Sequence, residues 1–259
     1  MAGVGPALKQ QQPNVMSKAI PTKEIRRLNV ANTILAIRYP TDGKIRSRKV
    51  ISRSKASSSG KYPSWKMGRM LQWESPHELN AFRLLDADPA VARFEEQPLV
   101  VSFVLDGIEH DHYPDIEVLV DGVKELWEVK TQADASRTEV SRRTELMTKA
   151  LPTHGYKYRV AIAEELTATP RLQNALTMLR SGRGDIHVVE RERLRLILKH
   201  TQKLTWSDVL AGALGVKSKA HACRLILEGA LHFDMGKVLE QSTVIGISRA
   251  GASHRGVFE

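Results

Sequence analysis

Residues 113–130 of the 259-residue chain read YPDIEVLVDGVKELWEVK, and this stretch decides the fold. Two apolar runs alternate with polar residues in it, which predicts a pair of β-strands. An Asp-Gly dipeptide between the runs favours the tight turn of a β-hairpin. Asp115 opens the first run, while Glu128 and Lys130 end the second. A buried charge is costly unless it is paired or binds a metal, so this region holds either a structural ion pair or a functional site.

The segment before this hairpin predicts a helix that begins after Ser75. Ser75 suits the N-cap, Pro76 suits the first helical position, and Glu78 stands three residues after the cap. Apolar residues then recur at helical spacing, at Leu79, Phe82 and Leu85, and an Asp-Pro dipeptide ends the pattern.

The order of elements around the hairpin predicts an α/β core with a mixed sheet. Another strand-like run, PLVVSFVL at 98–105, lies between the helix and the hairpin. A polar helical stretch at 134–151 follows the hairpin, and a buried strand is expected at 156–163. Helix, three strands, helix and strand is an order typical of α/β folds. Residues 30–39 suit either a strand or a helix.

The pattern changes at about residue 165. An amphipathic helix is predicted at 169–180, followed by a second helix that begins at a Thr205 cap and runs to Gly215. A short helix is expected at 218–228, and two strand-like segments separated by a glycine turn come after it. Two short helices followed by a hairpin form the pattern of a winged-helix-like α+β domain.

The positive charge of the chain is concentrated near its beginning. The net charge is +10, yet residues 1–70 hold 15 Lys and Arg against 2 Asp and Glu, which leaves −3 for the rest. A basic segment rich in serine suits the phosphate backbone of nucleic acid, although a solubilising tail has the same composition. We therefore expect three parts: a basic flexible arm at 1–55, a catalytic core at 56–164 and a C-terminal domain at 165–259.

Cysteine usage and hydropathy limit the setting of the protein. The single cysteine, Cys223, excludes an internal disulfide framework and a cysteine-rich zinc site. The longest apolar runs have the length of strands, so no interaction with a membrane is expected. Without a signal-type apolar segment, a reducing cytoplasmic location is the expectation.

The charged residues of the hairpin are expected to lie close together. Side chains two positions apart on a strand share a face, so Glu128 and Lys130 are expected to be neighbours, with Asp115 on the adjoining strand. Mg²⁺ takes carboxylate oxygens together with water and phosphate oxygens, and a lysine beside it stabilises charge on a phosphate. This set suits metal-assisted hydrolysis of phosphodiesters, although two carboxylates and a lysine also make an ordinary solvated ion pair.

The pattern Pro-Asp115 … Glu128-Val-Lys130 resembles the PD-(D/E)xK nuclease signature. Further motifs follow one another along the chain: YPS.K and WES..E, then D-P-x-V…F-E-x-Q-P, YPDIEVLVDG, WEVK and L-x-N…L-R. With this ordered set of motifs, the chain resembles the TnsA-like transposon endonucleases over roughly residues 60–180.

The resemblance implies a restriction-endonuclease-like mixed-sheet core that cleaves DNA with Mg²⁺, for which Mn²⁺ would substitute. Matching positions assign the metal ligands to Glu78, Asp115 and Glu128, and the catalytic lysine to Lys130. The implied activity is cleavage at the 5′ ends of a transposon during cut-and-paste transposition in a bacterial cytoplasm. The implied partners are the transposon-end DNA, a TnsB-like DDE transposase that cuts the 3′ ends, and a TnsC-like AAA+ ATPase.

Other interpretations stay open at this stage. A restriction-like or junction-resolving nuclease would have the same core, and a non-catalytic DNA-binding adaptor would keep only the binding surfaces. The C-terminal domain is compatible with contact to the ATPase, which we favour, or with the DNA major groove. Arg143 on the predicted helix suits either a phosphate contact or a solvated face, and His110 and His112 are expected at a loop edge rather than in a zinc site.

Overall fold

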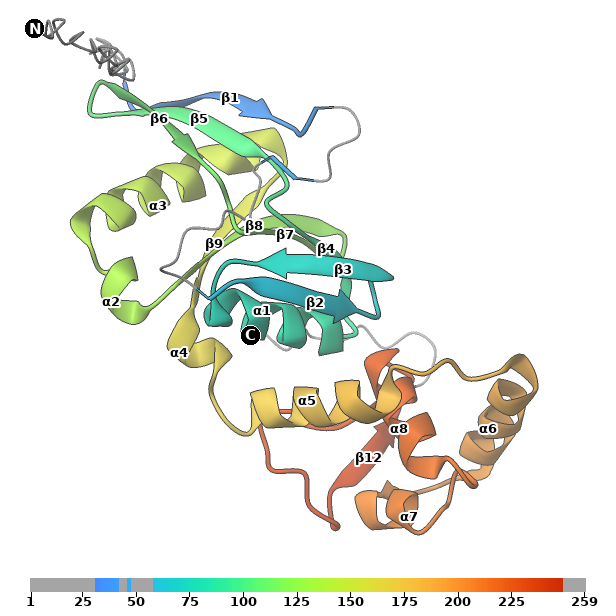
Figure 1. The fold of residues 1–259 in the computed structure, drawn as a ribbon. Helices are drawn as coiled ribbons and strands as arrows, with labels where there is room; N and C mark the ends of the chain where they lie inside the picture. Colours follow the sequence, from blue (N-terminus) through green and yellow to red (C-terminus); the bar gives the residue numbers. More distant parts are fainter. Residues whose placement is uncertain (1–30, 42–45, 48–57, 249–259) are drawn as a thin grey trace, which may run out of the picture.

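The computed structural model describes residues 31–41, 46–47 and 58–248, and these form a mixed α/β fold with several sheets. Figure 1 shows a part rich in strands and a smaller, mostly helical part, with α5 (Arg171–Gly182) lying between them. None of the helices in the described ranges is both long and apolar enough to cross a membrane.

The predicted hairpin lies at the centre of a four-stranded sheet. Its strands are β7 (Ile116–Val120) and β8 (Val123–Lys130), and the sheet order is β4-β7-β8-β9. Asp121 and Gly122 both have positive φ angles, of 48° and 77°, as a type I′ turn requires. β4 (Val91–Glu96) pairs antiparallel with β7, whereas β9 (Lys157–Ile162) pairs parallel with β8. The predictions of a hairpin and of a mixed sheet are confirmed.

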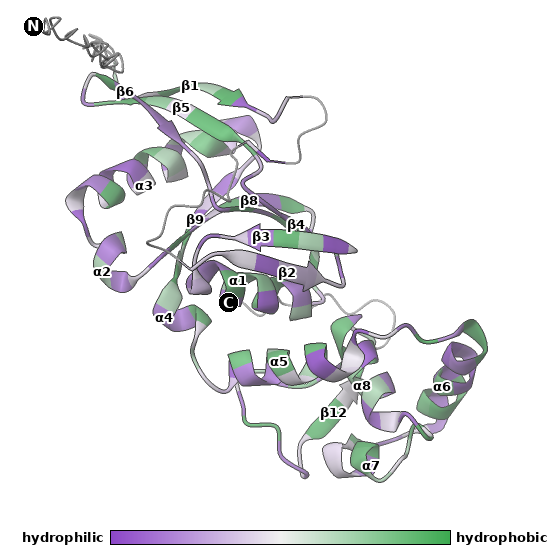
Figure 2. Ribbon diagram, in the orientation of Figure 1, coloured by the Kyte–Doolittle hydropathy of each residue, from purple (hydrophilic) through white to green (hydrophobic). Residues whose placement is uncertain are grey.

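A second sheet has the order β1-β5-β6, formed by β1 (Thr33–Arg38), β5 (Val100–Leu105) and β6 (Ile108–His112). β5 is buried along its whole length, and Figure 2 shows it as mostly hydrophobic. β1 pairs antiparallel with β5, so this segment of the predicted arm at 1–55 is part of a sheet. The remainder of the predicted arm falls mostly outside the described residues.

Two helices pack on opposite faces of the central sheet. Leu126 of β8 packs in a cluster with residues of α3 (Thr138–Ala150), whereas Trp127 and Val129 pack in another with residues of α1 (Pro76–Ala87). Because strand side chains alternate between faces, Glu128 shares the α3 face with Leu126. A short helix, α2 (Gln132–Ala135), connects β8 to α3, and α4 (Ala163–Leu166) follows β9.

Helix α1 begins and ends where the sequence predicts. The Ser75 hydroxyl accepts a hydrogen bond of 3.2 Å from the backbone N–H of Glu78, which satisfies one of the unpaired donors of the first turn. Pro76 occupies the first turn, where a missing N–H has no cost. Asp88 is the C-cap.

A hairpin that the sequence analysis did not predict packs against α1. It consists of β2 (Gly60–Ser64) and β3 (Arg69–Trp73). Asp86, a fully buried residue of α1, accepts hydrogen bonds from the hydroxyls of Tyr62 (2.8 Å) and Ser64 (2.6 Å). Its carboxylate also accepts from two backbone N–H groups of the turn, both at 3.2 Å. These four bonds fix the hairpin to the helix.

The C-terminal part has the order helix, strand, two helices and hairpin. Its elements are α6 (Val188–His200), β10 (Leu204–Thr205), α7 (Trp206–Leu210), α8 (Ser218–Leu227), β11 (Leu231–His232) and β12 (Val244–Ile247). The three strands form an antiparallel sheet in the order β10-β12-β11. Thr205 caps α7 in a capping box, as predicted, but α7 ends at Leu210 rather than Gly215. Gly212, with a φ of 95°, already turns the chain away from the helical path.

The two parts share one continuous core. A single cluster of buried apolar residues extends from Phe82 of α1 through Met178 of α5 to Leu227 of α8. A Cβ atom on Gly182 would lie 2.7 Å from the backbone of α8, so only glycine permits this close approach of α5 and α8. The end of α5 is therefore held firmly against α8.

Replacing Glu228 by glutamine is expected to destabilise the C-terminal part by about 2 kcal/mol, the magnitude of losing charged hydrogen bonds. Glu228 accepts two hydrogen bonds of 2.7 Å from Arg191 and one of 2.5 Å from Arg224. Burial opposes its ionisation, but the two arginines outweigh burial and hold the pKa of Glu228 below its usual value. The stabilisation is therefore present above the unfolded pKa of about 4.5 and is lost as the pH falls below it.

Thermal unfolding between pH 3 and pH 7 measures this effect. The wild type should lose more stability on acidification than the Glu228→Gln variant. Glu192→Gln is a matched control, because Glu192 pairs with Arg195 on the exposed side of α6 and is expected to matter little. Equal melting temperatures for Glu228→Gln and wild type at pH 7 would contradict the prediction.

Candidate active site

Asp115 is fixed by the backbone at the entrance of β7. Its N–H donates to the carbonyl of Trp127, and its own carbonyl accepts from the N–H of Gln97, both at 2.9 Å. Its Oδ2 accepts a hydrogen bond of 2.7 Å from the backbone N–H of Val129, on the neighbouring strand. The side chain is therefore held at the end of β8 that carries Glu128 and Lys130.

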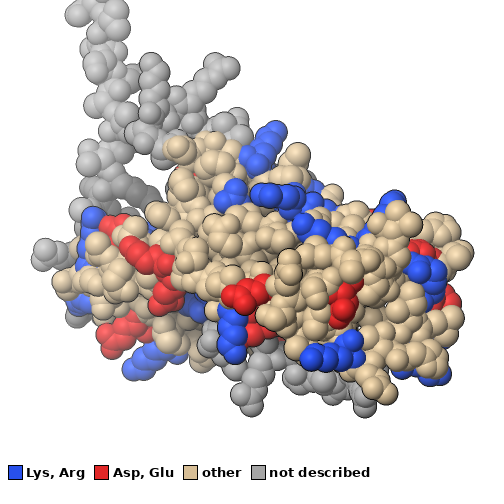
Figure 3. All heavy atoms as spheres, turned by 90° about the horizontal axis from the view of Figure 1, so that it is seen from below, with Lys and Arg blue, Asp and Glu red and all other residues tan. Residues whose placement is uncertain are grey.

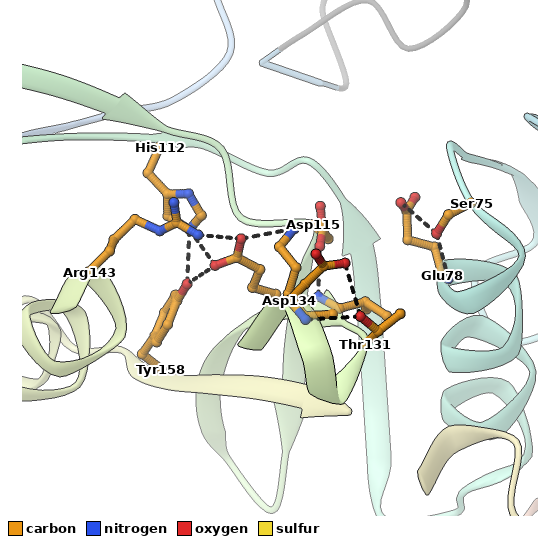
Figure 4. Close-up of polar contacts among 11 residues, drawn as sticks. Ser75, Glu78, His112, Asp115, Thr131, Asp134, Arg143 and Tyr158 are labelled. Atoms are coloured by element: carbon orange, nitrogen blue, oxygen red, sulfur yellow. Dashed lines mark hydrogen bonds and ion pairs between the residues drawn. The ribbon is translucent and has the colours of Figure 1, made fainter. Parts of the chain in front are cut away.

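Glu78 approaches Asp115 from the first turn of α1. Its Oε2 accepts from the N–H of Glu74 at 2.8 Å, and its Oε1 accepts from the Ser75 hydroxyl at 3.1 Å. Figure 4 shows the Glu78 carboxylate extending from α1 on one side of Asp115, with His112, Arg143 and Tyr158 on the other. The two carboxylates thus come from different elements, α1 and the segment that enters β7.

Burial raises the pKa of both carboxyl groups. Burial, and then the charge of Glu78, raise the pKa of Asp115 to about 7, although Lys130 and the Val129 amide act in the opposite direction. Burial also raises the pKa of Glu78 above its usual value, against the hydrogen bonds from Glu74 and Ser75. Asp115 is therefore buried beside a second carboxylate that opposes its ionisation, whereas the pKa of Glu78 is raised mainly by its own burial.

Lys130 and Glu128 are neighbours, as the alternation of the strand predicts. The Lys130 Nζ lies 3.1 Å from the Glu128 Oε1. Burial acts to lower the pKa of Lys130, but the charges of Glu128 and Asp115 outweigh burial and raise it. Lys130 is therefore a cation at neutral pH, suited to stabilising negative charge rather than to removing a proton.

Glu128 is buried and has more partners than the sequence suggested. Its Oε1 accepts a hydrogen bond of 2.6 Å from Arg143 of α3, in addition to the contact with Lys130. Its Oε2 accepts a bond of 2.5 Å from the Tyr158 hydroxyl of β9 and lies 3.6 Å from the His112 Nε2 of β6. Three groups therefore contact the Glu128 carboxylate at 3.1 Å or less, and the His112 Nε2 contacts the Tyr158 hydroxyl instead, at 3.0 Å.

These partners also set the charge of the Glu128 group. Burial opposes ionisation of Glu128, but its partners outweigh burial and hold its pKa at about 2. Burial lowers the pKa of His112 to about 4, so His112 is neutral at pH 7. The Tyr158 hydroxyl, whose pKa is raised by burial and by Glu128, stays protonated and donates.

Three of these partner residues have no common motif in the sequence. Arg143 was expected to contact phosphate or solvent. His112 was expected at a loop edge, whereas the structure places His112 on strand β6, where its side chain is buried. Tyr158 was treated only as part of an apolar strand. The sequence shows a tyrosine and an arginine on the elements that follow the hairpin. Only the structure shows that both side chains bind the Glu128 carboxylate.

The group expected to hold a metal is only partly assembled. Within the described ranges, no cluster of three or more His, Cys, Asp or Glu side chains lies close enough to hold a metal ion. Asp115 and Glu78 do fit a hard cation, because Mg²⁺ often takes two protein carboxylates and completes its shell with water and phosphate oxygens. A cation there would also favour the ionised form of both carboxyl groups, against the burial that raises their pKa values. That Glu128 is a third ligand stays a prediction, since its oxygens contact Arg143, Tyr158 and Lys130 instead.

No protein-family model matches the sequence, and no curated protein matches it either. The functional assignment therefore depends on the residues of the site and on the motifs in the sequence.

Proposed function

We propose that the chain is a Mg²⁺-dependent DNA endonuclease with a restriction-endonuclease-like core, of the TnsA type. The observation that supports this most is the pairing of Asp115 with Glu78 at the hairpin end, with cationic Lys130 next to them. Buried charges are costly unless they are paired or bind a metal, and carboxyl groups with strongly shifted pKa values are concentrated at functional sites. The sheet order, with a parallel strand β9 next to the hairpin, is compatible with such a core.

Each residue of the site has a role in the proposed reaction. Asp115 and Glu78 would hold the cation, which supplies charge stabilisation at the phosphodiester and makes water more acidic. Lys130 would place its positive charge beside the phosphate oxygens, where negative charge increases as the phosphorus–oxygen bond breaks. Glu128 orients Lys130, and Arg143 and Tyr158 hold Glu128 in place. The catalytic lysine is thereby fixed by a group that itself cannot rotate.

The C-terminal part is proposed to be a winged-helix-like domain that contacts a partner. The order of α6, β10, α7, α8 and the β11–β12 strands, with β12 in the middle of the sheet, supports this assignment. Buried residues occupy most of α8, and its Arg224 is paired with Asp185 and Glu228. An arginine that is already paired is poorly placed to contact DNA bases, which favours a protein partner such as a TnsC-like AAA+ ATPase for this domain.

The arrangement of strand breaks at the transposon ends tests the proposal. If genes for a DDE transposase and an AAA+ ATPase adjoin the gene of this chain, the three products can be combined with DNA that carries the element. In Mg²⁺, the wild type should yield breaks at both the 5′ and the 3′ ends, and Lys130→Met should yield 3′ breaks alone. If Lys130→Met still yields both the 5′ and the 3′ breaks, the assignment of Lys130 is wrong. Cleavage at internal or branched sites would favour a restriction-like or junction-resolving nuclease.

A further inference from the structure

A basic cleft of about 360 Å³ lies where the β2–β3 hairpin, α1 and α5 meet. Its walls carry four cationic side chains and no acidic one: Lys61 of β2, Arg83 of α1, Arg180 of α5, and Arg183 just beyond α5. Trp73, at the end of β3, forms part of the same wall. Figure 3 shows Lys and Arg side chains gathered without acidic neighbours on one part of the surface, whereas elsewhere the two charges alternate.

The four cations of this cleft lie close together without a counter-ion among the described residues. Within the described residues, no carboxylate forms an ion pair with Lys61, Arg83, Arg180 or Arg183. By contrast, the three arginines of α6 each pair with a glutamate. Like charges that gather without counter-ions attract an external anion.

Two of the cations are held in place before any ligand arrives. Arg183 donates a hydrogen bond of 2.9 Å to the Tyr62 hydroxyl and lies over the Tyr62 ring, at 5.2 Å from its centroid. Arg83 donates to the side chain of Asn80 at 2.9 Å. Because α5 packs without a gap on α8 at Gly182, the backbone that carries Arg183 is also fixed. Side chains ordered in advance lose less entropy when they bind.

The cleft is adjacent to the candidate active site. Leu79 follows Glu78 directly, and Arg83 lies five residues beyond Glu78, which is about 7.5 Å along the helix axis. The cleft and the candidate active site thus share α1, and Leu79 and Arg83 place one wall of the cleft within the first two turns of the helix that carries Glu78.

We infer that this cleft binds the phosphate backbone of duplex DNA that extends from the catalytic centre along α1 toward α5. The inference depends on the proposed nuclease function for its ligand, and it adds the path of the DNA. Contact with four unpaired cations would be independent of base sequence, since phosphates carry no sequence information.

Salt dependence of binding tests the inference without any cleavage. The full chain is titrated with a short fluorescent duplex in a buffer with EDTA, at several salt concentrations. The variant Lys61→Ala/Arg180→Ala removes two exposed cations of the cleft and is expected to lower the slope of log K against log salt by about 1.8, because each lost phosphate contact contributes about 0.9. Lys149→Ala/Lys157→Ala is the matched control, since it removes two exposed cations from α3 and β9 and should leave most of the slope unchanged.

The possible outcomes test DNA binding at the cleft separately from the proposed nuclease function. Equal loss of slope in both variants would mean that only net charge matters, and an unchanged slope in the cleft variant would overturn the inference. If the cleft variant instead weakens binding of polyglutamate and leaves duplex binding intact, the cleft serves an acidic protein and the inference is wrong. Cleavage that fails while the slope difference persists would refute the nuclease function alone.

Discussion

An Asp115→Asn variant is expected to fold normally and to lose strand cleavage by roughly a thousandfold or more, because a bound cation supplies several kcal/mol of charge stabilisation. Asparagine retains an oxygen that can accept the hydrogen bond from the Val129 N–H, so the hairpin end should keep its geometry. It loses the negative charge, and Glu78 alone is a poor site for Mg²⁺.

Melting in the presence and absence of Mg²⁺ adds a measurement that does not depend on activity. A ligand that binds the folded state raises its melting temperature, so Mg²⁺ should stabilise the wild type and leave Asp115→Asn unchanged. In metal-free buffer, the variant should be at least as stable as the wild type, because its side chain no longer repels Glu78.

Glu117→Gln is the matched control for this experiment. Glu117 lies two positions after Asp115, so it faces the same side of the strand, but it pairs with Arg93. Cleavage and Mg²⁺ stabilisation should both survive this change. If Asp115→Asn cleaves at the wild-type rate, or if both variants lose the response to Mg²⁺, the assignment of the metal site is wrong.

Asp86→Ala is expected to destabilise the protein by roughly 4 kcal/mol, a large fraction of the stability of a typical domain. The substitution removes the acceptor of four hydrogen bonds and leaves the hydroxyls of Tyr62 and Ser64 without their partner in the interior. Buried donors without acceptors lose the full cost of their desolvation, which is about 1–3 kcal/mol each. Denaturant unfolding monitored by circular dichroism measures the change.

Two further variants grade this effect. Ser64→Ala removes one donor to the Asp86 carboxylate and the acceptor of the Met67 N–H, and should cost about 1–2 kcal/mol, because the carboxylate keeps three other partners. Glu95→Gln changes a solvent-accessible carboxylate of β4 and should shift stability by less than about 0.5 kcal/mol. A cost for Asp86→Ala no larger than that of Ser64→Ala would show that the carboxylate does not hold the hairpin to α1.

Local chemistry explains which elements the sequence predicted. The start of α1 follows from Ser75, Pro76 and Glu78, and the β7–β8 turn follows from Asp121-Gly122, because each depends on adjacent residues alone. The β2–β3 hairpin has a proline and no Asn-Gly or Asp-Gly turn, so its strands carry little local signal. Helix α6 was missed because charged residues interrupt its apolar positions, of which only Leu194 is buried.

The sequence predicted only those contacts of the candidate site that lie within the hairpin. Glu128 and Lys130 are neighbours on one strand, so their contact follows from alternation alone. The contacts of Glu128 with Arg143 and Tyr158 join residues 15 and 30 positions apart, through the packing of α3 and β9 on β8. Periodicity places each of these residues on an element but does not specify which elements meet.

The continuous core that α5 shares with α1 and α8 also limits how this protein can be recombined with others. A chimera that exchanged residues 165–259 would replace the surface against which α1 packs, and α1 carries Glu78. The donor segment would need to match that surface, or the first turn of α1 would move relative to Asp115. The two parts of the chain therefore have to be exchanged together, and a designer who wants a different binding surface on the C-terminal part should alter the exposed side of α6 and leave α5 unchanged.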